Sequence, residues 1–224
     1  PVFHDDQHGT AVVVLAGLIN AMKVVNKNLG DCKIAMVGAG AAGTAIAKLL
    51  HQYAQPEIII VDSKAIISRN RTDLNEEKKI LLDFSNPNNV DGTLEDTILD
   101  ADIFIGVSKA ELLTEAMVKS MAQDPVIFAL ANPTPEIMPD VAKKAGTAII
   151  ATGRSDLPNQ VNNAVAFPGI FRGALDNGVH KITDAHKIAA AEAIAALIEN
   201  PSSENIIPSV FNEELVPSIA NVIH

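Results

Sequence analysis

A chain of 224 residues with 48% hydrophobic side chains is long enough to bury a sizeable core in one large domain. Its formal net charge of −10 argues against a nucleic-acid partner, which would need clustered Lys and Arg to neutralise phosphates. The single cysteine excludes an intrachain disulfide and is typical of a protein from the reducing cytoplasm. We see no stretch that approaches the roughly 18 to 20 apolar residues of a membrane span, so we expect no membrane partner.

The first predicted element is a helix over residues 10–25, where apolar residues recur at helical spacing. We expect Thr10 to cap this helix and Asn28 and Gly30 to close it. Before it lies a polar segment with two adjacent carboxylates, Asp5 and Asp6. If that segment is extended, the two side chains point to opposite faces, so that one can ligate a cation while the other contacts a different group.

The most informative element follows at residues 33–62. An apolar run enters the three glycines Gly38, Gly40 and Gly43, a helical pattern leaves them, and a second apolar run ends at Asp62. This order of strand, glycines, helix, strand and acidic residue is typical of dinucleotide-binding folds. Gly38 would allow the tight turn, Gly40 the approach of a pyrophosphate, and Gly43 the close packing of the helix. The helix N-terminus would attract the phosphates.

Further along, helical and apolar patterns alternate. A polar helix starts near Thr72 or Asp73, and a loop covers residues 83–93. The later predictions are helices at 94–99, 114–121 and 139–144, and strands at 103–107, 126–129 and 148–151. Past Gly153 we expect only helices, at 162–175, 184–198 and 212–223. The fold class is therefore α/β, a Rossmann-like doubly wound parallel sheet with flanking helices and a helical C-terminal segment.

We divide the chain into a leading motif with its helix (residues 1–30), a dinucleotide-binding core (31–160) and a helical segment of the same domain (161–224). Asn132, Asn162 and Asn163 follow predicted strand ends, where open α/β sheets bind ligands. Their amides can bond hydroxyl and carboxylate oxygens, although an Asn at such a place also forms turns. Ser108 lies after another predicted strand and is open to the same two interpretations.

The Asp5–Asp6 pair is also open to two interpretations. Carboxylates suit Mg²⁺ or Mn²⁺, whereas acidic residues before a helix also serve simply as caps. His4 and His8 raise the alternative of Zn²⁺, but the sequence lacks the remaining ligands at a recognised spacing. Cys32 begins a predicted core strand, and we interpret it as a small buried residue.

Taken together, these motifs resemble the malic enzyme family, specifically the cofactor-binding domain of its bacterial type. The similarity covers essentially the whole chain. The matching segments are residues 3–11 (FHDDQHGTA), 38–43 (GAGAAG), 61–64 (VDSK), 71–75 (RTDLN), 104–108 (FIGVS), 128–133 (FALANP) and 162–169 (NNAVAFPG). Such enzymes oxidise malate with NAD or NADP, decarboxylate the product and protonate the enolate to give pyruvate, with a divalent metal as Lewis acid.

The resemblance implies roles for individual residues. Asp6 would be the metal ligand, and Asp5 would assist the catalytic base. Asn132 and Asn162 would bind malate or pyruvate. The expected cofactor-binding residues are Gly38, Ala39, Gly40, Ala41, Ala42, Gly43, Asp62, Ser63, Ser108 and Asn132. The resemblance also suggests a homodimer.

The chain departs from the family because the catalytic lysine, the tyrosine acid and two further acidic ligands lie upstream of the Asp-Asp motif there. The only tyrosine here, Tyr53, belongs to the helix after the glycines and is expected to be structural. Three hypotheses follow: the cofactor-binding part of a malic enzyme, a free-standing dinucleotide-binding module without turnover, or another dehydrogenase of similar architecture. We expect the chain by itself to bind cofactor weakly and not to turn over malate.

The choice of cofactor depends on the end of the second strand. Asp62 can accept a bond from the ribose 2′-hydroxyl and should repel a 2′-phosphate, which favours NAD. Lys64, Arg69 and Arg71 lie nearby in the sequence and would suit NADP instead. We expect NAD, with NADP as the alternative.

Overall fold

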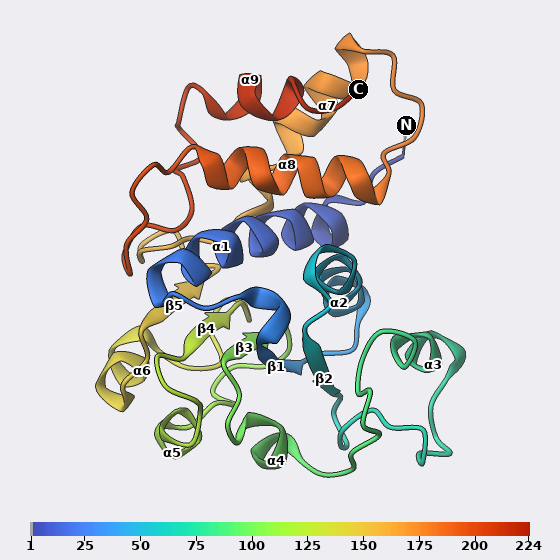
Figure 1. Cartoon of the computed structure of the whole chain (residues 1–224), viewed down its shortest axis with the longest axis vertical. Helices are drawn as coiled ribbons and strands as arrows, with labels where there is room; N and C mark the ends of the chain where they lie inside the picture. Colours follow the sequence, from blue (N-terminus) through green and yellow to red (C-terminus); the bar gives the residue numbers. More distant parts are fainter. Residues whose placement is uncertain (1) are drawn as a thin grey trace.

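The computed structural model describes residues 2–224, and its centre is a five-stranded parallel sheet between layers of helices (Figure 1). The strands are β1 (Lys33–Val37), β2 (Glu57–Val61), β3 (Ile103–Gly106), β4 (Val126–Ala129) and β5 (Ile149–Thr152). They lie in the order β2-β1-β3-β4-β5. Nearly every strand residue is buried, because helices cover both faces of a parallel sheet. The expected doubly wound α/β fold is confirmed.

The register brings the carboxyl ends of all five strands to one edge of the sheet. Val37 pairs with Val61 and Gly106, and Ala129 pairs with Gly106 and Thr152. The chain passes from β1 outward to β2 and then back to β3 on the other side of β1. The carboxyl edge between β1 and β3 is therefore the topological switch point, where ligands bind in open α/β sheets.

Two layers of helices cover the sheet. On one side lie α1 (Thr10–Val25) and α2 (Ala41–Ala54), followed by α8 (Asp184–Ala196) on α1 and by the outer pair α7 (Phe167–Asp176) and α9 (Leu215–Ala220). On the other side lie α4 (Leu94–Ile98), α5 (Glu115–Lys119) and α6 (Pro139–Ala145), while α3 (Glu76–Leu81) stands beside α2 (Figure 1). One hydrophobic cluster joins residues from near both ends of the chain, such as Val14 and Ile219.

Helix α1 runs through the middle of the molecule and is buried on almost all sides (Figure 1). It is continuous with the π-helical turn η1 (Asp5–Gly9). The combined helix Asp5–Val25 is long and apolar enough to cross a membrane by length and composition alone, contrary to our estimate from the sequence. However, 67% of its most apolar window is buried inside the domain, as in the core helix of a globular protein.

Several element boundaries differ from the predictions. Thr10 does not cap α1, because the helix already begins at η1 and the Thr10 hydroxyl donates to the Asp6 carbonyl. Asn26, in the left-handed conformation, closes α1 instead of Asn28. Helix α3 begins only at Glu76, because the Asn75 side chain accepts the Lys78 N–H and caps it there.

The C-terminal helices are shorter than predicted. A 3-10 turn, η3 (Asn163–Val165), precedes α7, and α9 covers only the middle of the predicted segment 212–223. Cys32 is 3% exposed, and burial raises the pKa of its thiol to about 11. This cysteine therefore packs as a small apolar residue, as predicted.

Candidate functional site

The glycine loop forms the centre of the carboxyl edge, and each of its three glycines has a different structural reason. Gly38 has φ +113°, a value that favours glycine, and a Cβ there would lie 2.7 Å from the Val107 carbonyl oxygen. At Gly43 a Cβ would lie 1.9 Å from the Gly38 carbonyl oxygen, so that the first turn of α2 packs directly on the loop. Around Gly40 a Cβ would meet nothing within 4 Å. The backbone is thus open to a ligand at Gly40.

Two hollows flank the glycine loop. One, of about 270 Å³, lies toward the end of β2 and is lined by residues that include Asp62, Ser63 and Ser108. The other, of about 350 Å³, is lined by Ala39, Gly40 and Ala41 of the loop and also by Gln7 and His8 of η1. The glycine loop and the Asp-Asp turn, thirty residues apart in the sequence, therefore border the same hollow.

Asp62 lies at the end of β2 with its carboxylate 4% exposed and fully engaged by this chain. Arg71 donates to both oxygens, at 2.9 and 3.1 Å, and Lys78 donates to one, at 2.5 Å. The backbone N–H groups of Lys64 and Ala65 complete the set. Burial opposes ionisation, but these hydrogen bonds outweigh it and hold the pKa of Asp62 well below its usual value.

Other basic residues near Asp62 are differently placed. Lys64 pairs with Asp73 at 2.6 Å, and Arg71 also contacts Asp73. Arg69, which the sequence placed near the ribose, instead donates to the backbone carbonyls of Leu82 and Asn86. Asp73, not Arg69, therefore belongs to the charged network around Asp62.

The predicted loop residues reach the same edge. Ser63 and Ser108 are exposed beside the 270 Å³ hollow, after β2 and β3 respectively. Asn132 is exposed after β4, and the peptide bond between it and Pro133 is cis. Asn162 is half-buried, and its side chain accepts the Ala164 N–H to cap η3, as the turn interpretation predicted.

The Asp-Asp turn is helical rather than extended, so the prediction that Asp5 and Asp6 alternate across a strand was wrong. Successive residues of a helical turn still diverge, and here Asp6 is exposed while Asp5 is half-buried. Asn163 of η3 donates a hydrogen bond to one oxygen of Asp5. Burial raises the pKa of Asp5, against the effect of Asn163 and with that of the neighbouring Asp6 carboxylate.

Some features of this turn suit a divalent cation. The other oxygen of Asp5, Oδ1, is buried without a hydrogen-bond partner among residues 2–224, an arrangement that costs free energy unless a donor or cation is nearby. The exposed carboxylate of Asp6 is beside it. Within the described part of the chain, however, no group of three or more His, Cys, Asp or Glu side chains could hold a metal ion, which also removes support for a zinc site at His4 and His8.

Sequence reasoning did not predict the partners that hold these groups. Asn163 appeared only as one amide among three, and Lys78 did not appear at all. A buried glutamate, Glu136, accepts the backbone N–H groups of Ser108 and Ala131 and was also missed. The clearest signal for it was the presence of a charged residue between the predicted strand 126–129 and helix 139–144.

Comparison with known proteins agrees with this geometry. A family model described as "Malic enzyme, NAD binding domain" matches residues 7–222. The chain belongs to the malic enzyme family. Among curated malic enzymes, it is 52% identical over its full length to the bifunctional malic/malolactic enzyme of Bacillus subtilis (strain 168), and 49% identical to the NAD-dependent malic enzyme of Geobacillus stearothermophilus. It covers 55% and 47% of those two proteins.

The structural comparison gives the same family. The malic enzyme from Pyrococcus horikoshii Ot3 superimposes with a TM-score of 0.96 at 45% identity, over 100% of this chain and 54% of that one. The NADP-dependent malic enzyme of Escherichia coli (strain K12) is 46% identical over 96% of this chain. Relatives of both cofactor types are thus similar, and the chain spans about half or less of the length of these malic enzymes.

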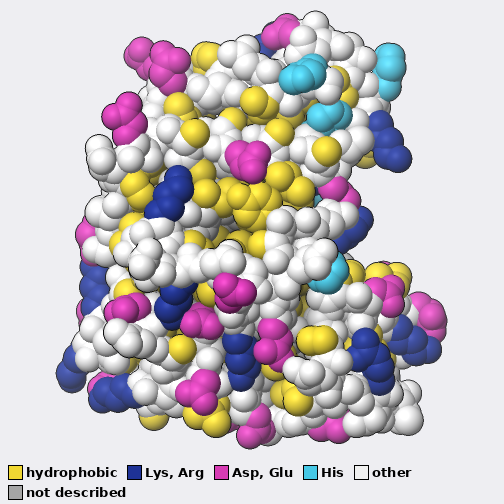
Figure 2. Space-filling view, in the orientation of Figure 1, with side chains coloured by type: hydrophobic (Ala, Val, Ile, Leu, Met, Phe, Trp, Pro, Cys, Tyr) yellow, Lys and Arg dark blue, Asp and Glu magenta, His cyan; other side chains and the backbone are white. Residues whose placement is uncertain are grey.

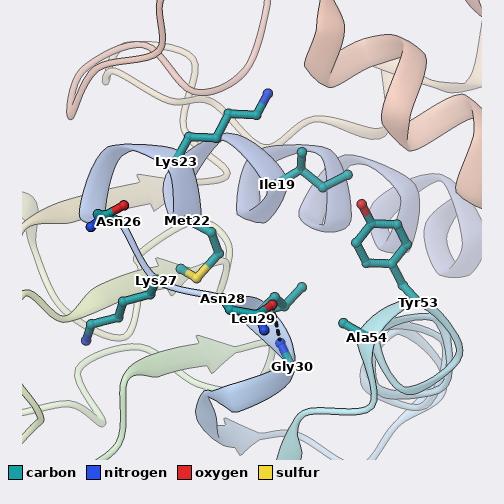
Figure 3. A pocket seen from close by; sticks show the side chains of 10 residues that line it. All are labelled: Ile19, Met22, Lys23, Asn26, Lys27, Asn28, Leu29, Gly30, Tyr53 and Ala54. Atoms are coloured by element: carbon teal, nitrogen blue, oxygen red, sulfur yellow. Dashed lines mark hydrogen bonds between the residues drawn. The ribbon is translucent and has the colours of Figure 1, made fainter.

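A larger hollow, of about 870 Å³, lies away from this site (Figure 3). It is bordered by Ile19 and Met22 of α1, by Tyr53 of α2 and by the loop that precedes β1. Figure 2 shows apolar side chains gathered in the hollowed middle of this face. Tyr53 is about 18 Å along α2 from the glycine loop, at a rise of 1.5 Å per residue. This distance favours the structural role predicted for the tyrosine.

Proposed function

We propose that this chain is the cofactor-binding part of an NAD(P)-dependent malic enzyme, which converts malate to pyruvate and CO₂ with Mg²⁺ or Mn²⁺. The observation that carries the proposal is the 350 Å³ hollow that the glycine loop shares with the Asp-Asp turn. A cofactor held at Gly40 would reach toward the carboxylates that handle the metal and the substrate. The family membership of the chain supports the same conclusion.

The residues have the following proposed roles. The N–H groups at the start of α2 bind the pyrophosphate, for which the open space at Gly40 leaves room. Ser63 and Ser108 contact the cofactor beside the 270 Å³ hollow. The exposed amide of Asn132 contacts both cofactor and substrate, and Asn162 binds malate through the amide nitrogen that its cap leaves available. The remaining loop contacts come from Ala39, Ala41, Ala42, Gly38 and Gly43.

Asp5 and Asp6 have different proposed roles because their surroundings differ. Asp6, with its exposed carboxylate, is the proposed metal ligand, and a bound divalent cation supplies Lewis-acid stabilisation of the developing negative charge on the C2 oxygen and the enolate. Asp5 is fixed by Asn163 and assists the catalytic base from its half-buried position. The described residues contribute one clear metal ligand, so the proposal requires further ligands from elsewhere in the full-length protein.

The test is malate-dependent reduction of NAD in the full-length protein, with pyruvate release followed in parallel and Mn²⁺ varied. Asp6→Asn should lower kcat by about 100-fold or more and raise the Mn²⁺ requirement, because a neutral amide is a poor ligand for a hard cation. Asp83→Asn, which makes the same change at an exposed position, is the control. Cofactor binding without malate turnover in the full-length wild-type protein would instead support a dinucleotide-binding module.

We further propose that NAD is the preferred cofactor. Asp62 lies where the ribose is expected, and the cations around it are already paired with Asp62 and Asp73. A 2′-phosphate would therefore meet a carboxylate and would have to compete for cations. This argument favours NAD, although Arg71 and Lys78 become available to a phosphate if Asp62 is removed.

The proposed preference is tested by substitution at Asp62. Asp62→Ala should lower the NAD-to-NADP ratio of kcat/KM by about tenfold or more, because it removes the carboxylate and frees two cations. Asp73→Ala, which removes a second carboxylate of the same network away from the strand end, is the matched control. An unchanged ratio in Asp62→Ala would show that Asp62 does not determine the preference.

The proposed partners are small molecules, malate and pyruvate, in a cytoplasmic homodimer. The net charge of −10 supports the absence of a nucleic-acid partner, and the buried free thiol of Cys32 suits a reducing compartment. The packing of the apolar helix Asp5–Val25 inside the domain favours a core role over membrane insertion. Sedimentation of the full-length protein would test the dimer.

A further inference from the structure

Glu136 is a charged residue in the interior, directly beneath the carboxyl edge of the sheet. Its side chain is fully buried, and its two oxygens accept different backbone N–H groups. Oε1 accepts from Ser108, in the loop after β3, at 3.0 Å, and Oε2 accepts from Ala131, in the loop after β4, also at 3.0 Å. One carboxylate therefore bridges the two loops that carry Ser108 and Asn132.

The space for this carboxylate exists because residue 106 has no side chain. A Cβ built on Gly106, the last residue of β3, would lie 2.3 Å from Cδ of Glu136 and 2.5 Å from Oε1. Neither atom is the free end of a flexible side chain, because both oxygens are held by backbone donors. Gly106 and Glu136 thus form an interlock, in which the glycine of one strand leaves room for the carboxylate of the next loop.

Backbone bonds strengthen the same connection. The Leu113 N–H donates to the Glu136 carbonyl at 3.0 Å, and the Glu111 N–H donates to the Pro135 carbonyl at 3.1 Å. Residues 107–113 and 130–136 are therefore joined along their length, with the carboxylate at the end nearest the sheet. The loops are fixed to each other as well as to their strands.

A buried carboxylate is a costly way to connect two loops, which calls for an explanation beyond stability. Burial raises the pKa of Glu136, while the bonds from backbone amides favour its ionised form. An apolar residue of similar volume would avoid the desolvation cost but would leave two N–H groups unpaired. A carboxylate offers two acceptor oxygens on one rigid plane, so it fixes the separation of the two loops as well as satisfying them.

We propose that Glu136 is a positioning residue of the active site, which sets the distance between Ser108 and Asn132 so that both reach the nicotinamide end of the cofactor and the substrate. This inference rests on the proposed function for the roles of those two residues. Glu136 itself does not touch cofactor or substrate, because it lies beneath the loops and is fully buried.

The test is Glu136→Gln in the full-length protein. A neutral amide has one acceptor oxygen, so its NH₂ group must face one of the two backbone N–H groups and push that loop away. We expect KM for malate and the dissociation constant for NAD each to rise by about tenfold or more, since an unpaired buried donor is costly. Glu111→Gln, at an exposed position in the neighbouring loop, is the control and should retain the wild-type values.

A cooperative thermal unfolding transition would show that Glu136→Gln is folded. A folded variant with wild-type KM for malate and wild-type NAD affinity, altered only in melting temperature, would overturn the proposal in favour of a purely stabilising role. If the variant does not fold, amide hydrogen exchange of the wild-type protein supplies the test. The N–H groups of Ser108 and Ala131 should exchange as slowly as sheet amides such as that of Phe128, and rapid exchange at either would overturn the proposal.

These measurements separate the two proposals. Absence of malate turnover in the wild-type protein would contradict the proposed function, while NAD affinity and hydrogen exchange would still report on Glu136. Normal wild-type turnover with an unaffected, folded Glu136→Gln variant would contradict only the positioning role.

Discussion

The three glycines of the dinucleotide loop show how one residue type meets three different requirements. Gly38 is required by its positive φ, Gly43 by contact with the Gly38 carbonyl, and Gly40 by neither. Only at Gly40 does the protein leave open space above an ordinary backbone conformation, with φ −86°. We therefore assign the ligand-related role to Gly40 and the structural roles to the other two.

This assignment predicts opposite outcomes for two alanine substitutions. Gly43→Ala should lower the free energy of unfolding by about 1–3 kcal/mol, because its Cβ would strike backbone atoms. Gly40→Ala should leave the unfolding free energy within about 0.5 kcal/mol of wild type, but should weaken NAD binding because the methyl group enters the space for the pyrophosphate. Denaturant unfolding and calorimetric NAD titration distinguish them. Equal destabilisation by both would contradict the assignment.

At the scale of elements, the segment after β2 is attached to the sheet mainly by charge. Arg71 is only 12% exposed and contacts both Asp62 and Asp73, so a single guanidinium connects the end of β2 with the approach to α3. The hydrogen bond from Lys78 makes a second connection to Asp62 from within α3. Because the pKa of Asp62 is held low, this attachment depends on pH.

We predict that removing Arg71 makes the protein less sensitive to acid. The ionised Asp62 contributes stability that is present above the unfolded-state pKa of about 4 and is lost as the pH falls toward its lower folded-state pKa. Arg71→Met should therefore lower the unfolding free energy at pH 7 and flatten its fall below about pH 4. Urea unfolding as a function of pH checks this, with the exposed Lys119→Met as control. An unchanged acid slope would contradict the role of the pair.

The sequence predicted those elements whose signals are local. The apolar runs of the five strands and the spacing of Gly38, Gly40 and Gly43 were sufficient to predict the sheet and the loop. The start of the first helix was misplaced, because the polar sequence of residues 5–9 carries no apolar periodicity and its π-helical form depends on packing against α2 and η3.

The site could be predicted only as far as its own residues. Asn163 lies 158 residues from Asp5, and Glu136 lies 28 residues from Ser108, so these pairs meet only through the order of strands and the packing of helices. Asp62 was found because strand and motif place it, but its occupation by Arg71 and Lys78 follows from a loop path that no periodicity encodes.

For the molecule as a whole, the distribution of functional groups predicts what this chain does in isolation. The dinucleotide site is built from one continuous sheet edge, whereas the described residues provide no cluster of metal-binding side chains. The 224-residue chain should therefore bind NAD, with low affinity, and show no malate-dependent NAD reduction. Calorimetry and a spectrophotometric assay test this, with the full-length protein as positive control. Malate-dependent reduction by the chain alone would contradict it.

The interlock of Gly106 with Glu136 also has a consequence for descent. A lineage cannot add a side chain at position 106 while it keeps the carboxylate in place, and losing the carboxylate leaves room that a larger residue at 106 can fill. Two positions thirty residues apart should therefore change together or not at all. Aligned relatives should contain the glycine–glutamate combination or a joint replacement of both, and single replacements should be depleted by selection.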